Sequence, residues 1–261
     1  MSKWIIFNAD DFGLTPGVSR GIMEAHRLGV VRSTSLMPNL PSFEESVEML
    51  KQCPNLDVGV HVNLTFGTPV SDPSEVRSLL DDSGNFWRKP SLLLESAKID
   101  EMRKEIRLQI EKCVDAGLTL THLDSHHHLH GCSTEVLDIF IDNACEFKLA
   151  LRSINREMRQ SIRDRGIPTP DFFNDDFYGE ENITLERIEN IIETMPQGYC
   201  EVMCHPGFID EELSEKSSYN KSRNLEVKIL THPRTMQSLQ KKEAKMLGYR
   251  DMLQFFPDFE K

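Results

Sequence analysis

Short apolar segments alternate with longer amphipathic segments along most of this 261-residue chain. Strands that alternate with helices in this way form a parallel sheet through right-handed crossovers. About six or seven strands predict a distorted or incomplete β/α barrel rather than an open sheet, built as a single domain over residues 1–261. The predicted strands are 3–10, 32–39, 57–65, 118–126, 149–154, 199–207 and 251–255. The predicted helices are 17–29, 42–53, 100–117, 133–147 and 184–195, with most of 225–247 also helical.

Two segments lack a regular apolar period, 66–98 and 164–183. The first carries three prolines and two glycines, and the second is rich in acidic and aromatic residues. Long irregular insertions in a compact domain are often lids or binding loops, so both are expected beside the functional site.

The composition indicates which partners are excluded and which cellular compartment is expected. A formal net charge of −12 argues against nucleic acid and anionic membranes as partners. No apolar run reaches bilayer length, and the N-terminal segment lacks the cleavage site of a signal peptide. The six cysteines contain no C-x-x-C pair, which indicates reduced thiols in a cytoplasmic protein. Cys200 and Cys204 are interpreted as buried strand residues rather than as zinc ligands.

Polar side chains gather where the predicted strands end. The carboxyl ends of parallel strands meet at one rim, and α/β active sites are built there. The side chains at this rim come from five strands and are Asp10, Asp11, His61, Asp124, His126, Arg152 and His205.

The segment THLDSHHHLH (121–130) holds five of the nine histidines, which favours a metal site. One carboxylate with two imidazoles leaves coordination positions open for water and substrate. Strand alternation would place Asp124, His126 and His128 on one side and His127 on the other. His126 is the preferred ligand because it lies nearest the strand end, and His128 is the alternative. Such donors suit one zinc, cobalt or manganese ion, and magnesium less readily.

Each of these residues also has a structural interpretation. The pair Asp10-Asp11 could form a turn before Gly13, although a second carboxylate beside a metal could also act as a general base. His205 could pack in a turn before Pro206, and Arg152 could pair with a carboxylate instead of binding substrate.

Four motifs in order, NADDFG (8–13), GVHVNLT (59–65), THLDSHHHLH (121–130) and EVMCHPGF (201–208), resemble the YdjC-like carbohydrate deacetylases. The resemblance spans nearly the whole chain. It implies a distorted β/α barrel, a divalent metal, and removal of N-acetyl groups from short N-acetylglucosamine oligomers such as chitobiose, with or without a phosphate. By position, Asp11, His61 and His126 match the family's metal ligands, Asp10 its general base and His205 its general acid.

The mechanism expected from these roles is hydrolytic. Asp10 takes a proton from water, and a protonated His205 gives one to the departing amine. The oligosaccharide is expected to contact Arg152, Asp124, His128 and Trp87. Trp87 lies in GNFWRKP, where a protruding ring could stack on a sugar, and the other loop aromatics are Phe172, Phe173, Phe177 and Tyr178.

Three other functions use the same residues. Two histidines and a carboxylate also form the iron site of oxygenases, although those usually have an all-β scaffold. A sugar-phosphate hydrolase could bind phosphate through Arg152, Arg156, Arg159 and Arg163. A non-catalytic metal or sugar-binding protein would need no general base. A homodimer is the expected assembly.

Overall fold

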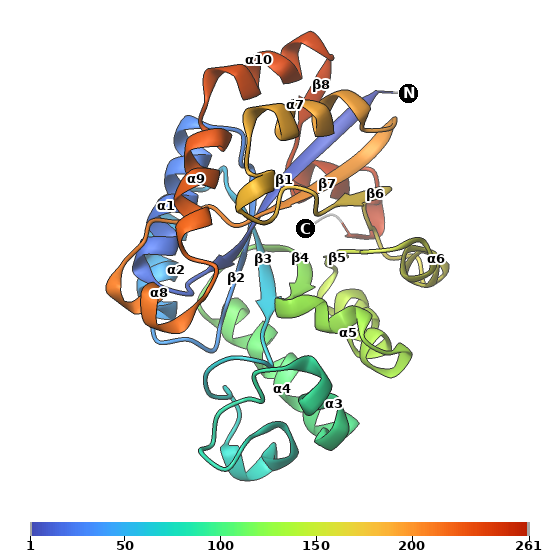
Figure 1. Ribbon diagram of the computed structural model, residues 1–261. Coiled ribbons are helices and arrows are strands. Elements are labelled where there is room, and N and C mark those ends of the chain that lie inside the picture. The colour runs from blue at the N-terminus through green and yellow to red at the C-terminus, as the bar shows by residue number, and fades with distance from the viewer. Residues whose placement is uncertain (1, 260–261) are drawn as a thin grey trace.

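Eight strands form one curved parallel sheet in the computed structural model of the protein, which describes residues 2–259 (Figure 1). The strand order is β5-β4-β3-β2-β1-β7-β6, and β8 pairs with β1. No pairing between the described residues joins β5 to β6, so the barrel is incomplete, as the sequence predicts. The strands are β1 (Lys3–Phe12), β2 (Ser33–Leu36), β3 (Asp57–Val62), β4 (Leu120–Ser125), β5 (Ala150–Leu151), β6 (Phe172–Asn174), β7 (Gly198–Cys204) and β8 (Ala244–Met246).

Helices surround this sheet (Figure 1). The hydroxyls of Thr15, Ser133 and Thr184 each accept a backbone N–H in the first turn of the helix that follows. The longer helices are α1 (Pro16–Leu28), α2 (Phe43–Lys51), α4 (Ile99–Asp115), α5 (Thr134–Phe147), α7 (Leu185–Thr194), α9 (Lys221–Leu230) and α10 (Pro233–Lys241). Helix α6 (Arg156–Asp164) is as long as α2 and α10, and the shorter helices are α3 (Pro90–Ser96), α8 (Glu211–Lys216) and α11 (Tyr249–Leu253). None of the described helices combines the length and apolar character needed to cross a bilayer.

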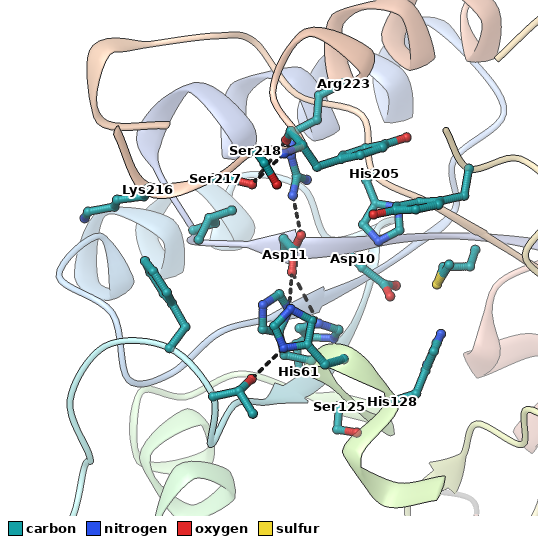
Figure 2. Close-up of a pocket in the computed structure, with 18 of the residues that line it drawn as sticks. Asp10, Asp11, His61, Ser125, His128, His205, Lys216, Ser217, Ser218 and Arg223 are labelled. Carbon is teal, nitrogen blue, oxygen red and sulfur yellow. Dashed lines mark hydrogen bonds and ion pairs between the residues drawn. The ribbon is translucent and has the colours of Figure 1, made fainter. Parts of the chain in front are cut away.

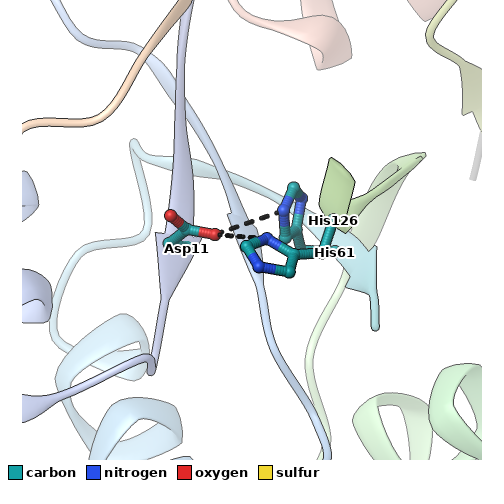
Figure 3. A group of neighbouring side chains, drawn as sticks. All are labelled: Asp11, His61 and His126. Atoms are coloured by element: carbon teal, nitrogen blue, oxygen red, sulfur yellow. Dashed lines mark ion pairs between the residues drawn. The ribbon is translucent and has the colours of Figure 1, made fainter. Parts of the chain in front are cut away.

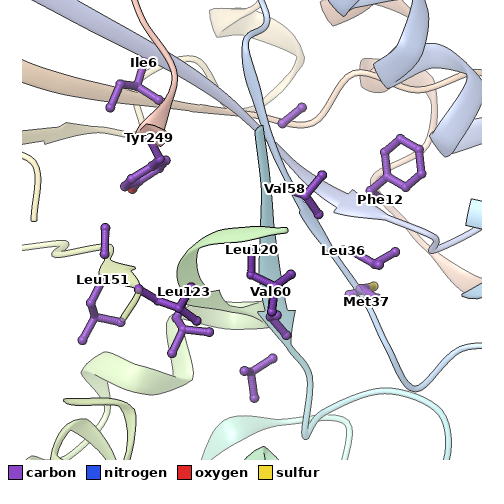
Figure 4. Packing of buried hydrophobic residues seen from close by; sticks show 14 of the residues in the cluster. Ile6, Phe12, Leu36, Met37, Val58, Val60, Leu120, Leu123, Leu151 and Tyr249 are labelled. Atoms are coloured by element: carbon purple, nitrogen blue, oxygen red, sulfur yellow. The ribbon is translucent and has the colours of Figure 1, made fainter. Parts of the chain in front are cut away.

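The strands are buried on both faces, as expected for a parallel sheet covered by helices. β1 is buried from Ile5 to its end, and every residue of β3 and β4 is buried. Figure 4 shows apolar side chains from neighbouring strands, among them Ile6, Val60 and Leu123, packed in this core. Charged groups buried in such a sheet must find partners inside it.

The strand predicted at 251–255 is wrong. Residues 249–253 form α11, in which Tyr249, Met252 and Leu253 are buried at helical spacing. The Gly248 N–H donates to Asp251 Oδ2 over 2.9 Å, which closes the first turn. The last strand is instead β8, which pairs with the first residues of β1.

The two irregular insertions differ in structure. The segment 66–98 contains two 3-10 turns, at Pro73–Glu75 and Arg77–Leu79, followed by α3. The segment 164–183 contains β6, a strand that the sequence did not predict and that pairs with β7. Each insertion sends residues to the pocket described below.

Candidate metal centre and active site

A cavity of about 500 Å³ opens at the carboxyl ends of the strands (Figure 2). This is the rim at which the sequence predicts an active site. Arg152, Asp124 and Trp87 do not line the cavity. The predicted residues that do line it are Asp10, Asp11, His61, His126, His128 and His205.

A bulge in β1 lets two consecutive aspartates reach one pocket. Neighbouring residues of a regular strand point to opposite faces. The register between β1 and β2 shifts between Ala9 and Phe12, and Asp11 has a φ of 72°. A non-glycine residue in this left-handed region is strained, and such strain often marks a functional site. The bulge therefore re-aims Asp11 beside Asp10.

Asp11, His61 and His126 converge on one point (Figure 3). Asp11 Oδ1 lies 3.3 Å from His61 Nε2 and 3.2 Å from His126 Nδ1. Asp11 Oδ1 is buried and has no hydrogen-bond partner among the described residues. The other carboxylate oxygen of Asp11, Oδ2, pairs with Arg223 Nη2. An orphaned carboxylate oxygen facing two imidazole nitrogens fits a divalent cation with one oxygen and two nitrogen ligands.

The other ring nitrogen of His61, Nδ1, pairs with a buried carboxylate. Asp124 Oδ1 lies 2.7 Å from His61 Nδ1, and Ser35 donates to Asp124 Oδ2 over 2.8 Å. A carboxylate behind a ligating histidine fixes the ring and its tautomer. Burial alone would lower the pKa of His61, but the neighbouring carboxylates outweigh it and raise the pKa to about 10. His61 is therefore protonated at neutral pH, and a metal ion bound at its Nε2 would have to displace a proton.

A second acidic cluster, formed by Asp10, His61 and Asp124, has the spacing of a metal site but is already neutralised. The Arg152 guanidinium lies 2.7 Å from Asp10 Oδ1 and 3.0 Å from Asp124 Oδ2. The Arg152 cation already pairs with both carboxylates of this cluster, so the group at Asp11 is the better candidate for a metal site.

Asp10 keeps one oxygen available for chemistry. Oδ1 accepts from Arg152 Nη2 and from Asn8 Nδ2, whereas Oδ2 accepts only from Arg152 Nη1 among the described residues. Burial would raise the pKa of Asp10, but the charge of Arg152 outweighs it and holds the pKa below its ordinary value. Asp10 is therefore ionised at neutral pH, with an acceptor site left on Oδ2.

The histidines of 121–130 divide into separate roles. The predicted strand alternation fails after Ser125, because β4 ends there and His126–Gly131 form a 3-10 turn. His127 and His128 adopt left-handed φ values of 55° and 51°, and both line the pocket.

The remaining histidines of this segment are structural. His122 and His130 are fully buried beneath the pocket, where burial lowers the pKa of each to about 3. Of the five, His126 alone joins Asp11 and His61 in one ligand group.

His205 lies beside an aromatic wall. Tyr178 and Tyr219 stack at 4.5 Å, and the His205 ring meets each of them edge-on at 5.5 Å. Burial lowers the pKa of His205 to about 4, so the resting imidazole is neutral at neutral pH. Figure 2 shows its ring directed toward Asp10.

Arg152 and Asp124 are not substrate contacts. Both side chains are fully buried and pair with other charged groups beneath the pocket floor. Arg152 pairs with carboxylates, which is the structural interpretation that the sequence also allows. Asp124 orients His61 instead of meeting a sugar.

Trp87, predicted to contact the sugar, does not line the cavity, and its half-buried ring packs against the core. We expect Trp87→Ala to lower the free energy of unfolding by about 1–3 kcal/mol, since a large apolar contact is lost. KM for an acetylated sugar should stay within twofold. Denaturant melts and initial rates measure the two quantities, and a KM raised tenfold at unchanged stability would restore the sugar-stacking role.

Several residues in and around the pocket are not predicted from the sequence. Arg223, Tyr219 and Lys216 lie in a charged, polar stretch with no distinctive spacing. Glu201 was visible as a single acid inside the apolar strand β7, a position that demands a buried partner. That partner is Arg152.

Residues 4–241 match the model of the YdjC-like protein family. The carbohydrate deacetylase of Thermoanaerobacter pseudethanolicus is 38% identical over 247 residues, which cover 95% of this chain and 98% of that protein. A Listeria monocytogenes carbohydrate deacetylase is 39% identical over 255 residues, with 95% and 99% covered.

A solved structure supports the same relationship. It is a protein of Enterococcus faecalis V583 named for a proposed cleavage of cellobiose phosphate. It superimposes with a TM-score of 0.91 at 34% identity, with 97% of this chain and 99% of that one covered. The resemblance seen in the four motifs is confirmed, and the chain belongs to the YdjC-like family of carbohydrate deacetylases.

Proposed function

We propose that this protein removes N-acetyl groups from short N-acetylglucosamine oligosaccharides such as chitobiose, with the help of one divalent metal ion. The observation that carries the proposal is the convergence of Asp11, His61 and His126 in a pocket also lined by Asp10, whose Oδ2 accepts only one hydrogen bond among the described residues. The carbohydrate deacetylase names of the relatives supply the substrate class.

The site divides the hydrolysis among its side chains. Asp11, His61 and His126 would hold the ion, which would supply polarisation of the acetamide carbonyl and a lower pKa for the attacking water. Asp10 Oδ2 takes the water proton as the new C–O bond forms. When the C–N bond breaks, that proton must end on the amine, and His205 is the neutral group placed to relay it.

The pocket mouth carries features suited to a sugar. Phe66 and Tyr178 provide apolar ring surface, and sugars rest their C–H faces on such rings. Arg88 lies over Phe66, 4.9 Å from the ring centre, and has no carboxylate partner among the described residues. The Arg88 guanidinium donates to the Lys216 carbonyl over 3.2 Å, and its unpaired charge at the pocket supports a substrate that also carries a phosphate.

Tyr178 is the aromatic residue that we expect to grip the sugar. Its side chain is 47% exposed at the pocket and stacks on Tyr219. Tyr178→Ala should raise KM for diacetylchitobiose by roughly tenfold, equivalent to about 1.4 kcal/mol of lost contact. Tyr178→Phe keeps the ring and should keep KM within twofold. If both variants bind substrate normally, the sugar contacts another wall.

The proposed function is tested by acetate release. N-acetylglucosamine oligomers of increasing length, with and without a 6-phosphate, are incubated with the purified protein before and after chelation. We expect acetate to appear, to stop with chelator, and to return with zinc, cobalt, manganese or magnesium. Absence of acetate from every acetylated sugar under all four metals would contradict the proposal.

The same experiment separates the other two enzyme classes. Phosphate release would indicate a sugar-phosphate hydrolase, but Arg152 is buried and Arg156, Arg159 and Arg163 lie on α6, outside the pocket. Oxygen consumption with ferrous iron and a keto-acid would indicate an oxygenase. The β/α barrel and the named relatives support the deacetylase.

A further inference from the structure

A chain of buried polar side chains runs from the C-terminal helix α11 to the proposed general base. The Tyr249 hydroxyl donates to Glu201 Oε2 over 2.7 Å. Arg152 donates to Glu201 Oε1 through Nε (2.9 Å) and Nη2 (2.7 Å), and to both oxygens of Asp10 at 2.7 Å. We infer that Tyr249 is a positioning residue of the proposed deacetylation, acting on Asp10 through Glu201 and Arg152.

Stability alone gives a weak reason for this arrangement. Tyr249, Glu201 and Arg152 are all fully buried. A buried ion pair is often no more stabilising than well-packed apolar residues of similar volume, because desolvation offsets the attraction. Three carboxylates share one guanidinium here, those of Asp10, Asp124 and Glu201. Three carboxylates around one guanidinium leave an excess of negative charge, which a neutral hydrogen-bond donor can stabilise. The Tyr249 hydroxyl is such a donor to Glu201.

The geometry of the guanidinium shows what Glu201 contributes. Glu201 binds the edge formed by Nε and Nη2, and the edge formed by Nη1 and Nη2 meets Asp10 in a two-point contact. A planar fork held along two edges cannot rotate within its plane. The carboxylate of Asp10, which lines the pocket, is thereby held in one orientation. A catalytic group misplaced by about 1 Å can lose a hundredfold in rate, so this orientation matters for turnover.

Helix α11 is itself held in place. The Tyr249 ring stacks on His122 at 3.9 Å, inside the barrel core drawn in Figure 4. His122 occupies the space that a side chain at Gly59 would fill, since a Cβ there would lie 2.4 Å from its ring. Asp57 Oδ2 accepts from the Arg250 N–H over 2.7 Å. The hydroxyl is therefore delivered by a rigid element, and its removal need not disturb the ring.

The inference rests on the proposed function and is tested by removing one oxygen atom. Tyr249→Phe should lower kcat about fivefold while KM and metal affinity stay within twofold. Tyr199→Phe is the matched control, because this half-buried tyrosine stacks on Trp4 and its buried hydroxyl has no described partner. It should leave kcat unchanged. A Tyr249→Phe variant that melts earlier at unchanged kcat would show a purely structural role and overturn the inference.

A double-mutant cycle tests the route. In a Glu201→Gln background, Tyr249→Phe should cause no further loss of kcat, because the hydroxyl acts through that carboxylate. A second full fivefold loss would overturn the route through Glu201.

A readout without catalysis keeps this inference separate from the proposed function. The buried Nε–H of Arg152 should exchange slowly with solvent, and NMR should show exchange at least about tenfold faster in Tyr249→Phe but not in Tyr199→Phe. Unchanged exchange in Tyr249→Phe overturns the inference, even if Glu201→Gln does not fold. Failure to release acetate from any sugar would instead overturn the proposed function and leave this measurement intact.

Discussion

Asp10→Asn is expected to lower kcat for acetate release by at least about a thousandfold while the protein still binds its divalent metal. A positioned general base contributes roughly a hundredfold to ten-thousandfold in rate. An amide cannot take the water proton, and its NH2 group would meet the donors of Arg152 where Oδ1 or Oδ2 now accepts. Metal binding should survive, because Asp11, His61 and His126 are unchanged.

Glu201→Gln is the control for this variant. It also replaces one of the carboxylates around Arg152 by an amide, but Glu201 does not line the pocket. Both variants should lose roughly 2–3 kcal/mol of stability, the cost of a charged buried hydrogen bond. Glu201→Gln should lower kcat only about fivefold, the loss expected of Tyr249→Phe, whereas Asp10→Asn should lower it at least about a thousandfold. Near-normal kcat of Asp10→Asn on acetylated chitobiose would show that another group is the base.

The sequence is enough to locate the rim of the site because of one physical rule. Parallel strands bring their carboxyl ends together, so polar residues at those ends must meet. Asp10, Asp11, His61, His126 and His205 follow from this rule, and all five line one pocket. The rule says where a strand ends. The rule does not say which side chains point into the protein below the strand ends. For this reason the sequence predicts Asp124 and Arg152 as substrate contacts, whereas both are buried in the structure.

The missed features depend on contacts between distant parts of the chain. Arg152 meets Asp10 across 142 positions, and Arg223 meets Asp11 across 212. Neither pairing leaves a local pattern. The error at 251–255 has a different cause, because a short apolar run is ambiguous between strand and helix. The turn signal beside Trp87 predicts where the loop bends. It does not predict where the Trp87 ring packs.

The second large effect is expected on metal affinity, at the histidine that provides the second imidazole ligand, either His126 or His128. Both histidines line the pocket, but only His126 places a nitrogen 3.2 Å from Asp11 Oδ1. Loss of a residue that merely supports a ligand typically costs tenfold to a hundredfold in metal affinity. His126→Ala removes a ligand itself, so we expect metal affinity to fall at least about a hundredfold, with kcat/KM falling in parallel. The His126 side chain is 18% exposed at the pocket, so stability should change little.

His128→Ala is the matched control, since it removes an imidazole from the same turn and should leave metal affinity within about threefold. Calorimetric titration with zinc in buffers of different ionisation enthalpy measures affinity and proton release together. Because the raised pKa of His61 leaves it protonated in the metal-free site, wild-type binding should release roughly one proton, and affinity should rise with pH. If His128→Ala loses the metal while His126→Ala keeps it, the ligand is His128, and the turn at 126–131 must rearrange when the ion binds.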